Sequence, residues 1–182
     1  YKIMLKNYIK SLSLIADTID ENLLKRFISV IDKTIKKNNK IFICGNGGSA
    51  SLSDHALCDW TKRLYPKKKC KIFDLTSNKS LISAIGNDIS FDKIFSYQIS
   101  IYAEKKDLCI FISSSGNSKN ILNGIIEAKK KGIKTILRRI WLKFVYQYVD
   151  LAFYVGTNNK KYYLKHCVCI FLYTHTHIYI YI

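Results

Sequence analysis

The sequence predicts an α/β fold built on a doubly wound parallel sheet, preceded by N-terminal helices. Two observations carry this prediction. Short apolar runs, typical of buried strands, alternate with stretches of helical spacing. Loops rich in glycine or serine follow two of these runs directly. Such alternation implies β-α-β crossovers, so we expect parallel strands with helices on both faces of the sheet.

The elements follow one another in a regular order. Residues 8–37 carry apolar side chains at three- and four-residue steps, which predicts one or two amphipathic helices. We expect strands at residues 40–44, 70–75, 108–112 and 133–137. We expect helices at residues 50–64 and 120–131, and a third helix that follows residues 76–78 and ends at residue 85.

Length and composition fit one compact domain. The chain has 182 residues, and its 48% apolar and 24% charged residues are ordinary usage for a protein with a packed core. The formal net charge of +17 would suit nucleic acid, a membrane surface or a phosphorylated metabolite. Because the lysines are spread along the chain, we interpret the charge as a solvated basic surface and do not favour nucleic-acid binding.

The six cysteines indicate a reducing compartment. They form no CxxC pair and show no zinc-ribbon spacing, so we expect reduced thiols and a cytoplasmic location. No apolar run reaches the roughly 18–20 residues that a membrane-spanning helix needs, and the N-terminus has no signal-peptide layout. We therefore expect no membrane partner.

The serine loop, residues 113–118 (Ser-Ser-Ser-Gly-Asn-Ser), lies between a buried strand and the start of a helix. At such a point unpaired backbone N–H groups and the helix dipole favour an anion, and phosphate is a natural ligand. The loop contains no Lys or Arg, so amides and hydroxyls would hold the ligand. Taken alone, the same residues fit an ordinary helix cap equally well.

The glycine loop, residues 45–49 (Gly-Asn-Gly-Gly-Ser), has the same place after an earlier strand. With Ala50 it matches G-x-G-x-x-A, the dinucleotide-binding fingerprint. That fingerprint needs an acidic residue about 20 positions on, whereas Asp74 comes nearly 30 positions after Gly45. The P-loop pattern also fails, since no Gly-Lys-Ser/Thr follows.

His55 and Asp59 are four residues apart on the predicted helix that follows the glycine loop. They therefore share one helix face and could hold a divalent metal or act as a coupled acid–base pair. Pairs of this kind are more often plain surface interactions, and the spacing does not decide between these alternatives.

Five linked motifs together resemble the phosphoheptose isomerases over about residues 8–137. They are Cys-Gly-Asn-Gly-Gly-Ser at 44–49, His55, Ala-Ile-Gly-Asn-Asp at 84–88, Phe-Asp-Lys-Ile-Phe-Ser at 91–96 and Ile-Ser-Ser-Ser-Gly-Asn-Ser at 112–118. The resemblance implies a SIS-type, flavodoxin-like domain at residues 37–165 after a helical segment at 1–36. It also implies an enzyme that isomerises sedoheptulose 7-phosphate to a heptose 7-phosphate through an enediol, as a homotetramer with shared active sites and with Zn²⁺.

The resemblance also implies the site residues. The substrate-binding residues would be Asn46, Gly47, Gly48, Ser49, Asn87, Asp88, Ser113, Ser114, Ser115 and Ser118. His55 and Asp59 would bind the metal, and Asp59 would be catalytic. The family has a glutamate at the position of Asp59, so the carboxylate reaches less far by about 1.5 Å. A displacement of about 1 Å can cost roughly a hundredfold in rate.

The family pattern is not found after residue 137. The family has a Gly-rich turn there, then a late helix with a Gln and, eight residues on, a catalytic and metal-binding His. Alignment would place these near residues 165–166 and 173–174, and His175 is close in number only. Residues 174–182 are nearly a two-residue repeat, so we set residues 166–182 apart as a product of a gene-model error, with a genuine edge strand as the alternative.

Two other functions stay open as alternatives. One is a non-catalytic SIS module that binds a sugar phosphate or a protein partner, which the altered Asp59 and the missing His favour. The other is nucleic-acid binding, which only the net charge supports.

Overall fold

The computed structural model describes residues 20–65, 69–139 and 151–154, with six isolated helical positions between residues 3 and 13. The predicted N-terminal helix is confirmed by α2 (Glu21–Lys36), which Asp20 caps by accepting hydrogen bonds from two backbone N–H groups. The other residues before 20 lie outside the described part, as do the tail at 166–182 and the positions considered for the late Gln and His.

Strands and helices alternate along the rest of the chain. They are β1 (Lys40–Gly45), α3 (Gly48–Leu64), β2 (Lys71–Asp74), α4 (Lys79–Ile85), a π-helical turn (Gly86–Ser90), a 3₁₀ turn (Phe91–Lys93), α5 (Ile94–Tyr102), β3 (Leu108–Ser113), α6 (Lys119–Lys130), β4 (Lys134–Arg139) and β5 (Leu151–Tyr154). Every strand and helix predicted between residues 40 and 137 is confirmed, while α5 and β5 were not predicted. No helix of the described residues is long and apolar enough to cross a membrane.

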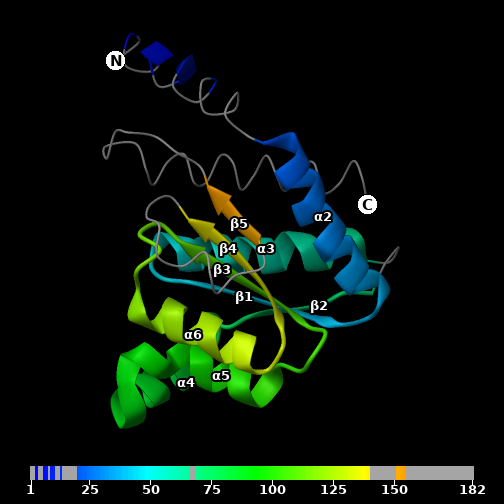
Figure 1. Ribbon diagram of the computed structural model, residues 1–182. Coiled ribbons are helices and arrows are strands. Elements are labelled where there is room, and N and C mark those ends of the chain that lie inside the picture. The colour runs from blue at the N-terminus through cyan, green and yellow to red at the C-terminus, as the bar shows by residue number, and fades with distance from the viewer. Residues whose placement is uncertain are drawn as a thin grey trace.

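The described strands form one parallel sheet in the order β2-β1-β3-β4-β5 (Figure 1). From β1 the chain moves to β2 on one side and then crosses to β3 on the other, so the direction of winding reverses between β1 and β3. Their register pairs Gly45 with Ile112, and the two strands therefore end side by side. This is the strand order of flavodoxin-like doubly wound folds, which confirms the predicted fold class.

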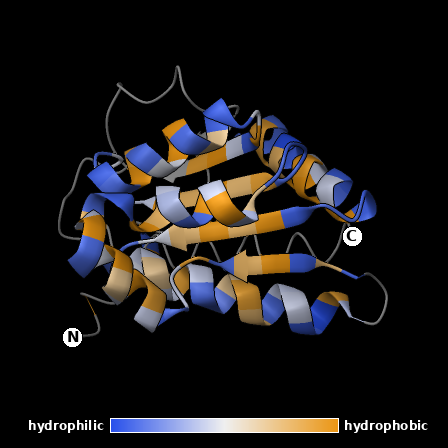
Figure 2. Cartoon of the chain, turned by 90° about the horizontal axis from the view of Figure 1, so that it is seen from below, coloured by the Kyte–Doolittle hydropathy of each residue, from blue (hydrophilic) through white to orange (hydrophobic). Residues whose placement is uncertain are grey.

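Two hydrophobic cores lie on opposite faces of the sheet. On one face, α2 and α3 pack over Ile41 and Ile43 of β1. On the other, α4, α5 and α6 pack over Phe42 and Cys44. Successive side chains of a strand point to opposite faces, so a central strand that is covered twice must be apolar throughout. Figure 2 shows the apolar strands running between the two helical layers.

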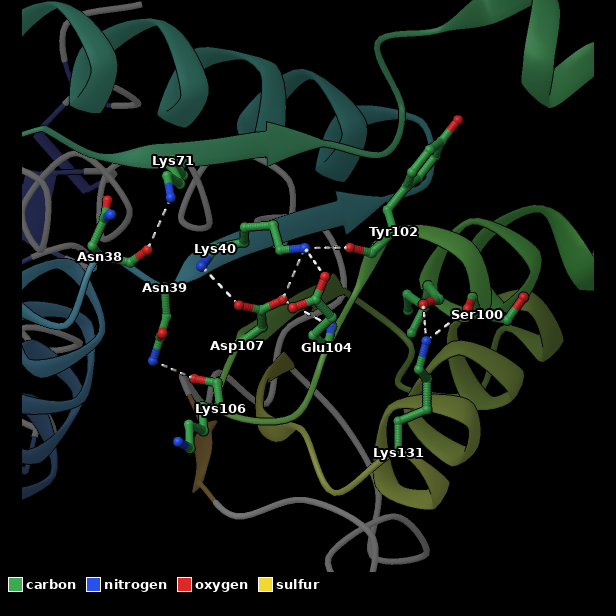
Figure 3. A network of polar contacts seen from close by, with 11 residues as sticks. Asn38, Asn39, Lys40, Lys71, Ser100, Tyr102, Glu104, Lys106, Asp107 and Lys131 are labelled. Atoms are coloured by element: carbon green, nitrogen blue, oxygen red, sulfur yellow. Dashed lines mark hydrogen bonds and ion pairs between the residues drawn. The ribbon is translucent and has the colours of Figure 1, made fainter.

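A polar network joins the amino ends of β1 and β3 (Figure 3). The buried carboxylate of Asp107 accepts hydrogen bonds from the backbone N–H groups of Lys40 and Glu104, each at 2.8 Å. The Nζ of Lys40 donates to the Tyr102 carbonyl at 2.8 Å and lies 3.7 Å from the Asp107 carboxylate. Asp107 thus fixes where β3 begins relative to β1.

We expect Asp107→Ala to lower the free energy of unfolding by about 2–4 kcal/mol, because two partly buried N–H groups lose their acceptor and the Lys40 ammonium loses one of its oxygen partners. Glu104→Ala is the matched control. It removes a carboxylate 3.1 Å from the same ammonium, but that side chain is 79% exposed, so the loss should stay below about 1 kcal/mol. Urea denaturation measures both variants, and equal losses would contradict the role given to Asp107.

Candidate functional site at the ends of β1 and β3

The glycine loop connects β1 to α3 through a very close approach of helix and strand. A Cβ at Gly45 would lie 2.6 Å from the Cβ of Ser49 and 2.7 Å from its carbonyl oxygen. Gly47 precedes the helix with a φ of 55°, in the left-handed region that favours glycine. Ser49 is buried, and its N–H donates to the Asn46 carbonyl at 3.0 Å. Gly47 and Gly48 are exposed at the helix N-terminus.

The serine loop is folded by its own hydroxyls. The buried Ser113 Oγ accepts a hydrogen bond from the Gly116 N–H at 3.0 Å, and the exposed Ser115 Oγ accepts one from the Asn117 N–H at 3.2 Å. A hydroxyl that accepts one hydrogen bond can still donate its own hydrogen. Both side chains therefore keep a donor for a ligand. Ser114 is half-buried within the same loop.

The start of α6 also provides backbone donors. Ser118 is the N-cap residue and makes no side-chain cap hydrogen bond, while its carbonyl accepts from the Leu122 N–H at 3.0 Å. Within the described residues no acceptor is found for the backbone N–H groups of Ser118, Lys119 and Asn120. The positive end of the helix dipole lies at the same place, so this end of the helix favours an anion.

The glycine loop is joined to the first turn of α6 by a reciprocal pair of amides. The Nδ2 of Asn46 donates to the Oδ1 of Asn120, and the Nδ2 of Asn120 donates to the Oδ1 of Asn46, both at 2.9 Å. Asn120 was not among the predicted site residues. Asparagine in a first helical turn is common as a local backbone partner, so its residue type alone gave no signal of a contact across the sheet.

Asn87 and Asp88 lie on the π-helical turn that follows α4. Both are exposed, and the Nδ2 of Asn87 donates to the Oδ1 of Asp88 at 2.9 Å. The 3₁₀ turn that follows is tied to α6 by the Nδ2 of Asn123, which donates to the Asp92 carbonyl at 2.9 Å. Among the described residues no hydrogen bond joins Asn87 or Asp88 to the glycine or serine loop.

His55 and Asp59 lie on α3, and His55 is about 10 Å along the helix axis from Gly48. The Nε2 of His55 is 3.4 Å from the Oδ2 of Asp59, with the side chains 50% and 20% exposed. Two ligand atoms at about 2.0–2.1 Å from a tetrahedral Zn²⁺ are themselves about 3.4 Å apart, so this pair fits two positions of such a site. In the described part of the chain no group of three His, Cys, Asp or Glu side chains could hold a metal.

Asp74, the acidic residue weighed for a dinucleotide site, has a structural role. Its buried carboxylate accepts hydrogen bonds from the Ser53 hydroxyl and the Thr76 N–H, both at 2.8 Å. Burial raises the pKa of Asp74, while the hydrogen bonds from Thr76 and Ser53 act in the opposite direction. The carboxylate thus links the end of β2 to α3 rather than facing a ribose.

A cavity of about 380 Å³ lies elsewhere, between β2 and α5. Its walls include Phe42 and Phe73, whose rings stack with centroids 5.4 Å apart, and the buried Gln98. None of the predicted site residues lines it. The loops and helix ends of the site predicted from sequence are therefore separate from this cavity.

We expect Gly45→Ala to lower the free energy of unfolding by about 1–3 kcal/mol or more, because the added Cβ meets α3 well inside contact distance. Gly86→Ala is the control, since the nearest atom to its added Cβ is the Phe91 ring at 3.8 Å. That change should be neutral or slightly stabilising. Thermal unfolding of the two variants measures the difference, and a stable Gly45→Ala protein would contradict the close approach.

The chain is similar in sequence to a known protein family and to characterised members of it. Residues 5–137 match the family described as SIS domain. The phosphoheptose isomerase of Aliarcobacter butzleri is 37% identical over 128 residues, which are 70% of this chain and 67% of the relative. That of Campylobacter concisus is 41% identical over 109 residues, or 59% of this chain and 57% of the relative. The chain thus spans about three fifths to two thirds of the length of the curated relatives it matches.

Solved structures share the fold at lower identity. The phosphoheptose isomerase of Neisseria gonorrhoeae superposes with a TM-score of 0.84 at 22% identity, covering 97% of this chain and 96% of that one. That of Francisella tularensis gives 0.83 at 20% identity, covering 97% and 95%. The NanR protein of Vibrio vulnificus, solved with ManNAc-6P, gives 0.67 at 15% identity, covering 97% and 60%.

Proposed function

We propose that this chain, which belongs to the SIS domain family, is a phosphoheptose isomerase that converts sedoheptulose 7-phosphate to a heptose 7-phosphate. The observation that carries the proposal is the meeting of the glycine and serine loops at the ends of two adjacent strands. Ligands of open parallel sheets bind at the carboxyl ends of strands, where the winding reverses. Curated phosphoheptose isomerases at 37–41% identity support the choice of substrate.

The serine loop would hold the phosphate. The hydroxyls of Ser113 and Ser115 keep their hydrogens for donation, and the N–H groups of Ser118 and Lys119 add backbone donors at the helix N-terminus. The side chains of Ser114 and Ser118 are half-buried in the same region. From the glycine loop, Asn46, Gly47, Gly48 and Ser49 would contact the sugar.

Asp59 would carry the proton transfer. Isomerisation through an enediol needs a base that takes a proton from C1 of the ketose and returns it at C2. It also needs a second group, an unidentified histidine, that moves a proton from the C1 hydroxyl to the C2 oxygen. The carboxylate of Asp59 can act as that base and then as the acid, and the imidazole of His55 at 3.4 Å would orient it. His55 and Asp59 would also provide two of the ligands for a Zn²⁺ ion. A bound Zn²⁺ polarises the substrate carbonyl and stabilises negative charge on its oxygen.

We further propose a cytoplasmic homotetramer with sites shared between subunits. Ile89 and Phe91 are 54% and 58% exposed and follow Asn87 and Asp88, Ile89 on the same π-helical turn and Phe91 on the adjoining 3₁₀ turn. Burial of these apolar side chains against a second copy would stabilise the assembly. In such an assembly, Asn87 and Asp88 of one subunit would contact the sugar hydroxyls in the site of a neighbouring subunit. The four described cysteines are free, as a reducing compartment requires.

The phosphate site is tested with Ser115→Ala and Ser118→Ala combined. We expect the affinity for sedoheptulose 7-phosphate to fall at least about tenfold, since a hydrogen bond to a charged group is worth roughly 1.5–3 kcal/mol. Ser100→Ala is the control: it removes a hydroxyl that donates to the Tyr97 carbonyl at 2.7 Å on α5, and should leave the affinity unchanged. Calorimetric titration of the three proteins decides, and wild-type affinity in the double variant would contradict the assignment.

The catalytic role is tested with Asp59→Glu, which restores the longer side chain expected from the family resemblance. We expect turnover of sedoheptulose 7-phosphate with Zn²⁺ to rise by about tenfold to a hundredfold, because the carboxylate regains about 1.5 Å of reach. Asp59→Asn should abolish turnover without loss of phosphate affinity. An unchanged rate in both variants would rule out Asp59 as the base.

A non-catalytic binding module is the second candidate. The shorter Asp59 and the lack of a third metal ligand in the described residues favour it. Tight binding of sedoheptulose 7-phosphate by the wild-type chain, without turnover in the presence of Zn²⁺, would establish this alternative.

A further inference from the structure

We propose that Asn120 is a positioning residue for phosphate binding, because its pairing with Asn46 holds the glycine loop against the start of α6. The proposal rests on the proposed function in one respect, namely that the serine loop binds the phosphate. It concerns a residue that contacts other protein groups and has no role of its own in the proton transfer.

The geometry of the pair is what makes it rigid. Two hydrogen bonds of 2.9 Å join the same two side chains, so both their separation and their relative orientation are fixed. Asn120 is only 2% exposed, and Asn46 is half-buried. The carbonyl of Asn46 also accepts the Ser49 N–H that opens α3. Through Asn46, the position of Asn120 therefore sets where the exposed Gly47 and Gly48 lie relative to the serine loop.

Asn120 also controls which donors of α6 stay available. Its Oδ1 accepts the Ile121 N–H at 2.9 Å in addition to the Asn46 amide. This bond satisfies the buried N–H that follows Asn120 in the first turn. The preceding N–H groups of Ser118 and Lys119 remain for an anion, as described above. One side chain thus both joins the glycine loop to α6 and satisfies a buried N–H of its first turn.

Other residue types would not serve both purposes. An apolar side chain at position 120 would leave the amide of Asn46 and the Ile121 N–H without this partner in a buried place. Aspartate could still accept from both groups, but it has no N–H to donate to the Asn46 Oδ1. It would also place a negative charge beside the phosphate.

A merely structural role predicts a different result from a positioning role. If Asn120 only stabilises the fold, its removal lowers stability, and the folded protein binds phosphate as before. If it positions the loops, affinity falls in protein that is fully folded. Asn123 is the matched control, because it lies one turn further along α6 and its Nδ2 donates to the Asp92 carbonyl, also at 2.9 Å.

The experiment titrates inorganic phosphate into the wild-type chain, Asn120→Ala, Asn46→Ala, the double variant and Asn123→Ala, with circular dichroism to verify folding. We expect Asn120→Ala to weaken phosphate binding about tenfold and Asn123→Ala by less than about twofold. The double variant should bind no more weakly than Asn46→Ala, since residues that act as one unit are not additive. Should Asn120→Ala not fold, Asn120→Ser replaces it with the same expectation.

Folded Asn120→Ala that binds phosphate as tightly as Asn123→Ala would overturn the proposal, and so would additive losses in the double variant. Failure of the proposed function has a different signature. A wild-type chain that binds phosphate but does not turn over sedoheptulose 7-phosphate contradicts the isomerase, while the binding comparison still decides the role of Asn120. A wild-type chain that binds neither inorganic phosphate nor sedoheptulose 7-phosphate contradicts both the isomerase function and the role of Asn120.

Discussion

The reversal of winding between β1 and β3 is the constraint from which the site follows. The two strands end side by side, and the helices that continue from them cover opposite faces of the sheet, α3 on one and α6 on the other. The N-termini of both helices therefore come together at one sheet edge, and their unpaired N–H groups with them. The glycine loop, the serine loop and the amides of Asn46 and Asn120 all lie at this edge.

The binding and catalytic parts of the site differ in how they depend on side chains. Phosphate would be held by the hydroxyls of the serine loop together with backbone N–H groups at the start of α6, whose positions are determined by the fold. Proton transfer would depend on a few side chains of α3, where the length of one carboxylate matters. A chain of this family could therefore keep its binding function after its chemistry has been lost. An aspartate at position 59, in place of the glutamate of the family, is a change that would reduce catalysis and leave phosphate binding intact.

The sequence predicts β1 and β3 well because a strand covered on both faces must be apolar at nearly every position. It does not predict α5, because this helix has large apolar residues on its exposed side as well, among them Tyr97 and Ile101. The periodic signal of a one-sided helix is then missing. The amide pair is also invisible, since Asn46 and Asn120 are 74 residues apart and meet only through the register of β1 with β3.

The serine loop contains no cation, and this bears on how ionic strength would act on the protein. Binding by neutral amides and hydroxyls releases few counterions, so the equilibrium affinity for a phosphate ester should vary little with salt. The net charge of +17 acts at longer range, where it attracts anions and raises the rate of encounter. Dissolved salt screens that attraction within about 10 Å at 0.1 M. Salt should therefore slow the arrival of the substrate, and the affinity should change chiefly through this slower encounter.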